Sequence, residues 1–136
     1  MFSKLIPTII LLSGFFSNTY AFQFPLEIID YMDDATIIVY AKKDDINKTS
    51  TWIPGDTAPP LTIEKLVSTV NSWLKTRPKM QNLKINEIEL KQVHKHEKDN
   101  YWYYLIQLKN KQNVKYIAIL MNGQILPAIK EPKSYK

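Results

Sequence analysis

The segment from Tyr101 to Leu126 constrains the fold of this chain more than any other part of its sequence. It contains two apolar runs of strand length, YWYYLIQLKN and VKYIAILMNGQIL, separated by the polar residues KQN. The second run includes Asn122-Gly123, a pair typical of tight hairpin turns because both residues tolerate positive φ. The pattern therefore predicts the centre of an antiparallel sheet.

Side chains of the first run alternate between the two faces of the predicted strand. Even-numbered residues share one face and odd-numbered residues share the other. One face should meet a helix, and the other should be partly exposed or covered by the loop around Trp52. Because an aromatic sheet face can bind a partner, the candidate binding face consists of Trp52, Tyr101, Trp102 and Tyr103.

The clearest helix begins after Thr62, whose hydroxyl can cap the first turn. Leu61 and Leu66 have the spacing of a hydrophobic staple, and Pro78 ends the run. The apolar positions form one stripe that suits a helix lying on a sheet. They are Ile63, Leu66, Val67, Val70, Trp73 and Leu74.

The remaining elements follow from β-branched runs and turn residues. Ala35 to Ala41 is a predicted strand whose continuous apolar character implies burial on both faces. Phe22 to Asp34 is a predicted lead-in with room for a short helical turn. Ile46 to Pro60 is a predicted loop, in which Trp52 buries its ring. Leu83 to Val93 predicts a strand with a bulge near Asn86-Glu87, where the apolar parity slips.

These elements predict an α+β fold in which one main helix packs on a curled antiparallel sheet of four to five strands. The predicted order is strand-helix-strand-strand-strand, with a short last strand at Gln124 to Leu126 that Pro127 ends.

Residues 1–21 have the three parts of a secretory signal: Lys4, an apolar stretch of about a dozen residues, and a small-residue site ending at Ala21. Cleavage there leaves residues 22–136 as a single exported domain. The apolar stretch is shorter than the roughly 20 residues that span a bilayer, and no later segment predicts a span. The chain has no cysteine, which excludes a disulfide-stapled scaffold and cysteine chemistry.

The net charge is +5, and the lysines are scattered rather than clustered. This charge favours an anionic surface or an acidic protein as the partner and disfavours nucleic acid. His94 and His96 are the only histidines and are weak candidates for a metal site, because Lys95 and Lys98 would repel a cation. We predict an exposed turn there, and no cofactor.

The sequence lacks a nucleophile with a base and an orienting partner, so we predict that the protein is not an enzyme. The leading hypothesis is a noncatalytic exported binding or inhibitory module. The alternative is a structural subunit or accessory protein of an envelope assembly, and a small hydrolase or metal-binding protein is disfavoured.

Several features resemble small exported bacterial domains of PepSY type, which have a cystatin-like helix-on-sheet arrangement. They are the loop with Trp52 and Pro54, the helix after Pro59-Pro60, the strand with Trp102-Tyr103-Tyr104, and the closing segment from Leu120 to Ile125. The resemblance covers about residues 61–126. It implies a noncatalytic module in the periplasm or outside the cell that restrains a protease or binds another envelope or secreted protein, and it transfers no site residue.

Overall fold

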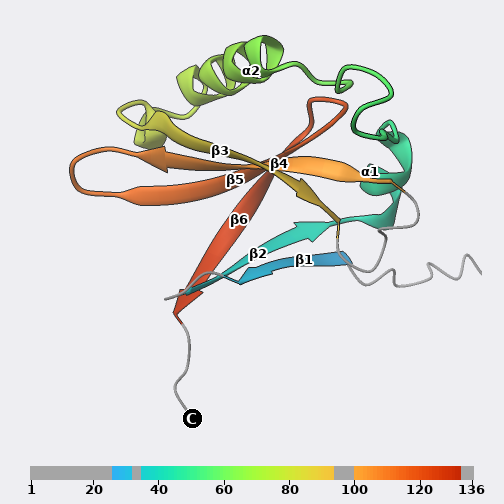
Figure 1. Cartoon of the computed structure of the whole chain (residues 1–136). Helices are drawn as coiled ribbons and strands as arrows, with labels where there is room; N and C mark the ends of the chain where they lie inside the picture. Colours follow the sequence, from blue (N-terminus) through green and yellow to red (C-terminus); the bar gives the residue numbers. More distant parts are fainter. Residues whose placement is uncertain (1–25, 32–34, 94–99, 133–136) are drawn as a thin grey trace, which may run out of the picture.

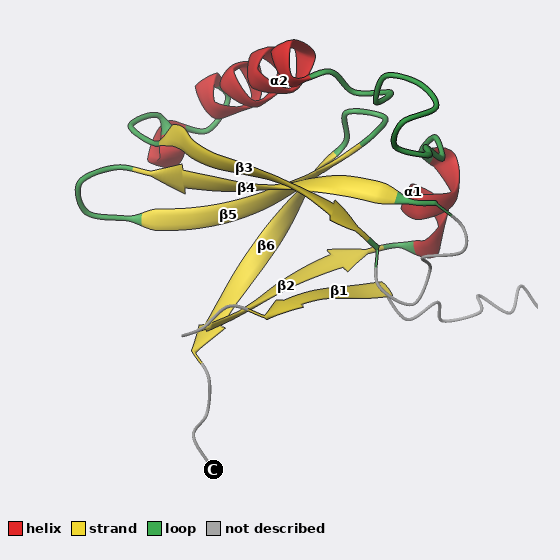
Figure 2. Ribbon diagram, in the orientation of Figure 1, coloured by secondary structure: helices red, strands yellow, loops and turns green. Residues whose placement is uncertain are grey.

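The computed structural model describes residues 26–31, 35–93 and 100–132 (Figure 1). Six strands form one sheet in the order β1-β2-β6-β5-β4-β3, and every neighbouring pair is antiparallel (Figure 2). The elements in chain order are β1 (Leu26–Tyr31), β2 (Ala35–Ala41), α1 (Lys43–Lys48), α2 (Ile63–Lys75), a 3-10 turn η1 (Pro78–Met80), β3 (Lys84–Gln92), β4 (Trp102–Lys109), β5 (Val114–Leu120) and β6 (Ile125–Pro132).

The predicted fold class and element order are therefore wrong. The sheet has six strands rather than four to five, and two strands and two helices precede β3. The lead-in contains β1, which is a strand because it pairs with β2 along its whole length. The charged segment after β2 forms α1, since the Asp45 side chain accepts a hydrogen bond from the Lys42 backbone and caps the first turn. β6 continues five residues beyond Pro127.

Several local predictions are confirmed. β2 spans the predicted residues, and α2 begins at the predicted cap, where the Thr62 hydroxyl accepts from the Lys65 backbone N–H at 3.2 Å. The register of β3 against β4 shifts between Ile85 and Glu87, which is the predicted bulge. The last hairpin turns at Asn122-Gly123, but only Gly123 has positive φ, at 89°. Its N–H donates to the Leu120 carbonyl at 2.9 Å.

The sheet buries apolar side chains on both of its faces. The helix-side cluster lies between α2 and strands β3 to β5, and includes Leu66, Val70, Tyr104, Ile106 and Ile119. The inner cluster lies on the other face, and includes Ile37, Val39, Tyr103, Leu105 and Leu120. Figures 1 and 2 show how this arises: β6 crosses obliquely from β5 to β2, so that β1 and β2 lie across from β3 to β5. The sheet thus curls over itself.

Two expectations about burial need correction. β2 is buried on one face only, because its odd-numbered residues point into the inner cluster while Tyr40 on the other face is 40% exposed. On α2, Val70 is fully buried and Val67 is half-buried, but Ile63 in the first turn is 50% exposed. The stripe therefore covers the sheet from Leu66 onward, and the start of the helix projects beyond it.

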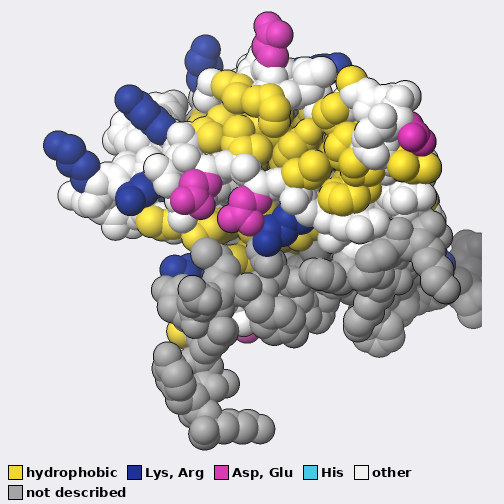
Figure 3. Space-filling model, viewed as in Figure 1, with side chains coloured by type: hydrophobic (Ala, Val, Ile, Leu, Met, Phe, Trp, Pro, Cys, Tyr) yellow, Lys and Arg dark blue, Asp and Glu magenta, His cyan; other side chains and the backbone are white. Residues whose placement is uncertain are grey.

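The surface below α2 is partly apolar. Figure 3 shows hydrophobic side chains gathered beneath this helix, over the strands that it covers, whereas lysine and arginine lie mainly toward the end of the sheet that carries the β4–β5 turn. Neither helix in the described part of the chain has the length and apolar character needed to cross a bilayer.

Candidate ligand groove between strands β5 and β6

A split in the sheet forms the candidate site. β6 pairs with β5 over three residues, from Ile125 opposite Ile119 to Pro127 opposite Ile117. Its next five residues, Ala128 to Pro132, pair instead with β2 on the opposite edge. In the described residues, β5 and β6 therefore stop pairing at Pro127, although both strands continue. A groove opens between them.

The backbone groups of both strands point into this groove. The Leu120 N–H donates to the Gln124 carbonyl at 2.9 Å across the β5–β6 hairpin. Because backbone groups alternate between the two edges of a strand, every second residue from this pair onward also faces the other strand. On β5 these residues include Tyr116 and Val114, and on β6 they include Ala128 and Lys130. Continued pairing would join Tyr116 to Ala128 and Val114 to Lys130, but the described ladder contains neither pair.

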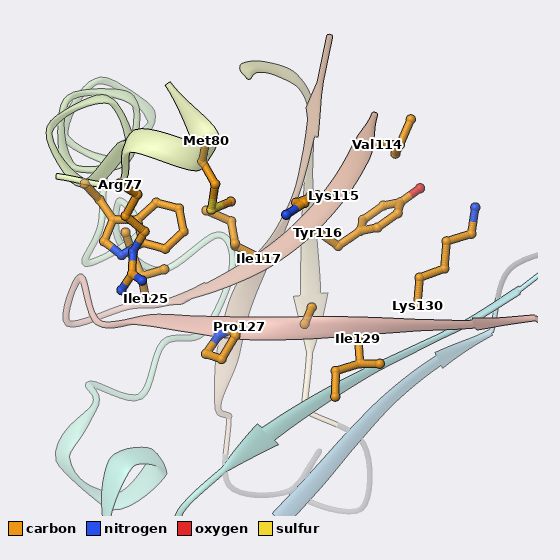
Figure 4. A pocket seen from close by; sticks show the side chains of 12 residues that line it. Arg77, Met80, Val114, Lys115, Tyr116, Ile117, Ile125, Pro127, Ile129 and Lys130 are labelled. Atoms are coloured by element: carbon orange, nitrogen blue, oxygen red, sulfur yellow. The ribbon is translucent and has the colours of Figure 1, made fainter. Parts of the chain in front are cut away.

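The side chains around the split enclose a volume of about 490 Å³, which lies in the range of small-ligand sites. Figure 4 shows Arg77 and Met80 reaching in from the end of α2 and from η1, with Ile117 and Ile125 below them and Pro127 and Ile129 along β6. The described residues that line the groove are Trp73, Arg77, Met80, Val114, Lys115, Tyr116, Ile117, Ile125, Pro127, Ala128, Ile129 and Lys130.

The turn after α2 positions the helix-side wall of the groove. The Thr76 hydroxyl and backbone both donate to the Trp73 carbonyl, and Met80 N–H donates to the Arg77 carbonyl at 2.9 Å. Pro78 then begins η1, because its fixed φ suits the first position of a helical turn. This turn brings the Arg77 side chain over the Trp73 ring. The distance from its guanidinium carbon to the ring centroid is 4.6 Å, within cation–π range.

The groove combines an apolar lining with positive charge. Its cations are Arg77, Lys115 and Lys130, and none of the described residues that line it is acidic. Two of its apolar side chains are unusually open to solvent, Val114 at 41% and Ile129 at 48%. An apolar ligand that carries negative charge matches both properties, since it can bury these side chains and neutralise the cations.

The four residues of the predicted aromatic face do not form one exposed surface. Trp52 and Trp102 pack together in the helix-side cluster, with ring centroids 5.7 Å apart in an edge-to-face arrangement. Tyr103 is buried on the opposite face, in the inner cluster, and Tyr101 packs against that cluster. β2, rather than the Trp52 loop, covers this second face.

Trp52 holds its loop to the domain, as the polar composition of that loop predicted. The residue is 8% exposed, its indole N–H donates to the Thr57 carbonyl at 2.9 Å, and its backbone N–H donates to the Asn100 carbonyl at 3.0 Å. The indole nitrogen of Trp102 is also buried, but it has no hydrogen-bond partner among the described residues.

The predicted turn with His94 and His96 lies outside the described residues. Within the part of the chain that the structure describes, no cluster of three or more histidine, cysteine or carboxylate side chains is arranged to hold a metal ion.

Sequence reasoning missed the groove. Its one local signal is Pro127, which we interpreted as the end of the last strand. A proline lacks the N–H needed for a ladder hydrogen bond, so it also suits a strand that changes its pairing partner.

No protein-family model, curated protein or solved structure matches this chain. A functional assignment therefore depends on the geometry of the groove and on the sequence.

Proposed function

We propose that this protein is a noncatalytic binding module whose ligand occupies the groove between β5 and β6. The observation that supports the proposal is the split in the sheet at Pro127, which leaves a cavity of about 490 Å³ with an apolar lining and three cations. Binding sites of this kind combine a largely apolar wall, which supplies affinity, with a few polar groups, which supply orientation.

The proposal places the protein in the periplasm or outside the cell, on the strength of the signal-like residues 1–21. Its ligand would then belong to another envelope or secreted molecule. The net charge of +5, which becomes +4 when Lys4 is removed with residues 1–21, favours the approach of an acidic partner, and the groove concentrates that preference at one place. An inhibitory action, which the PepSY-like features imply, would require that the bound partner be a protease.

An apolar anion is the simplest probe of the groove. We expect 1-anilinonaphthalene-8-sulfonate to bind the full chain at one saturable site, with increased dye fluorescence. Ile129→Asp should weaken this binding at least about tenfold, because it places a negative charge on an apolar wall of the site. Ile53→Asp is the matched control: Ile53 is similarly exposed, at 51%, but does not line the groove. The control should bind the dye within about twofold of the wild type.

Because this dye also binds partly folded states, each variant must show a cooperative urea transition before titration. Equal dye binding by the wild type and both variants would contradict the proposed site. So would the absence of saturable binding by the folded wild type.

A further inference from the structure

We infer that the ligand of the groove is an extended peptide segment that adds as a strand to the free edge of β5 and carries both apolar and acidic side chains. This inference rests on the proposed function and names the class of ligand. It depends on three properties of the groove: free backbone groups, apolar walls and positive charge.

The backbone of β5 provides the first argument. The alternation directs the N–H groups of Val114 and Tyr116 and the C=O of Val114 into the groove, beyond the last described pair of β5 with β6. An unpaired strand edge is a template for another chain, and recognition domains use such edges to bind peptides by strand addition. A ligand without a peptide backbone would leave these donors and acceptors unmatched.

The edge of β5 is a better template than the facing edge of β6, because both Val114 and Tyr116 have an N–H to donate. The next residue of β6 after Lys130 whose backbone would face the groove is Pro132, which has no N–H to donate. We therefore assign the added strand to β5.

The side chains of the groove specify the composition of the peptide. Ile117, Pro127 and Ile129 offer apolar contacts, while Lys115, Lys130 and Arg77 offer positive charge without a described acidic residue in the lining. Alternate side chains of a strand point to opposite faces. An extended peptide with alternating apolar and acidic residues can therefore direct its acidic side chains to the α2 side of the sheet, where Lys115 and Arg77 lie, and its apolar side chains to the opposite side, toward Val114 and Tyr116.

The test uses a fluorescein-labelled peptide of four Val-Glu repeats and the full chain, with binding measured by fluorescence anisotropy in 0.15 M salt. Two N-methylated peptides provide the backbone test, one methylated on every valine nitrogen and the other on every glutamate nitrogen. In a strand paired along one edge, only one of these two sets of N–H groups faces β5. We expect one methylated peptide to lose at least about tenfold in affinity and the other to stay within about threefold.

A proline substitution tests the edge from the side of the protein. Val114→Pro removes the N–H that faces the groove, and by the same alternation it leaves the pairing of β5 with β4 intact. We expect it to weaken peptide binding at least about fivefold. Val114→Ala, which keeps the N–H, should bind within about twofold of the wild type. A urea transition for each variant separates a loss of binding from a loss of folding.

A charge test uses two double variants with the same net charge. Arg77→Gln with Lys115→Gln should weaken peptide binding about fivefold or more and reduce its salt dependence. Lys109→Gln with Lys111→Gln changes exposed residues outside the groove and should bind within about twofold.

Equal effects of the two methylation patterns, wild-type binding by Val114→Pro, or no binding of the unmodified peptide would overturn the inference. A dimer of the chain that the peptide dissociates, seen by light scattering, would also overturn it, because the occupant would then be a second copy. If dye binding and its Ile129→Asp effect persist in any of these cases, only the inference fails. If dye binding fails as well, the proposed function fails with it.

Discussion

The hydroxyl of Tyr104 should contribute measurably to stability, because it makes a buried hydrogen bond between the sheet and the start of α2. The Tyr104 O–H donates to the Leu61 carbonyl oxygen at 3.0 Å, and the two residues are 3% and 2% exposed. They are 43 positions apart in the sequence, so this bond fixes a tertiary contact. Tyr104→Phe removes the bond and leaves the packing of the ring in place.

The expected cost of Tyr104→Phe is about 1–3 kcal/mol, because the variant loses a hydrogen bond and leaves a buried carbonyl without this donor. For a domain of this size that corresponds to a fall in Tm of about 4–12 °C. Urea unfolding at pH 7.5 measures the free energy directly. Tyr40→Phe is the control, because Tyr40 is 40% exposed on the outer face of β2, and it should change stability by less than about 0.5 kcal/mol.

The pH dependence of the same pair provides a second test. Burial raises the pKa of the Tyr104 hydroxyl above its ordinary value. The folded protein therefore keeps this proton at pH values where the unfolded chain has lost it, and the stabilisation is complete below about pH 10 and declines as the pH rises toward the higher folded pKa. The stability of the wild type should approach that of Tyr104→Phe above pH 10. A difference that is absent at pH 7.5, or that widens from pH 9 to 11, would refute this reasoning.

Two further pairs of substitutions test the packing of α2 and the last hairpin, both by urea unfolding. Leu66→Ala should lower the free energy of unfolding by about 2–5 kcal/mol, since Leu66 is fully buried against the sheet. Ile63→Ala, at a half-exposed position on the same helix, should lower it by less than about 1 kcal/mol. Equal effects would show that the helix packs through a different face. Gly123→Ala should lower the free energy of unfolding by about 1 kcal/mol. Backbone strain at φ 89° is the only source of this loss, because an added Cβ meets no atom within 4 Å. Gly123→Asn should lower it less, and an alanine variant as stable as the wild type would exclude this turn conformation.

Local chemistry was predictable from the sequence where a few neighbouring residues determine the structure. The Thr62 cap, the bulge beside Ile85 and the turn at Gly123 each depend on a side chain or a backbone preference within about four residues. In each case the residues that give the signal also make the contact. The sequence therefore located these features to within one or two positions.

The strand that covers the sheet face opposite α2 was not predictable in the same way. Tyr103 and Leu105 needed an apolar partner, but no signal near them in the sequence indicates that β2 provides it. The segment that precedes β2 was not recognised as a strand for a related reason. Its acidic residues leave no clear alternation of apolar and polar positions, and β1 is a strand because it pairs with β2. Such pairings depend on distant segments, which pattern analysis of one segment does not see.

α1 shows how charge alone can mislead. The run Lys42-Lys43-Asp44-Asp45 is typical of a turn, and it directly follows the strand that we predicted to end at Ala41. The same residues cap a short helix, because Asp45 accepts from the Lys42 backbone and Ile46 buries its side chain in the inner cluster. α1 is also held to the β5–β6 turn, where the Gln124 amide donates to Asp45 at 3.1 Å. These tertiary contacts favour a helix over a turn.

The groove and the inner cluster have a common structural origin in β6. Three of its residues pair with β5, the next five pair with β2, and none pairs with both. β2 pairs with the part of β6 that follows Pro127, so the direction of that part sets the position of β2. β2 can lie over Leu105 only because β6 turns away from β5 at Pro127. Continued pairing of Tyr116 with Ala128 would close the groove and draw β2 away from the core. A strand added at β5 therefore fills a space that the curl of the sheet requires, and its binding free energy would add to the stability of the folded state.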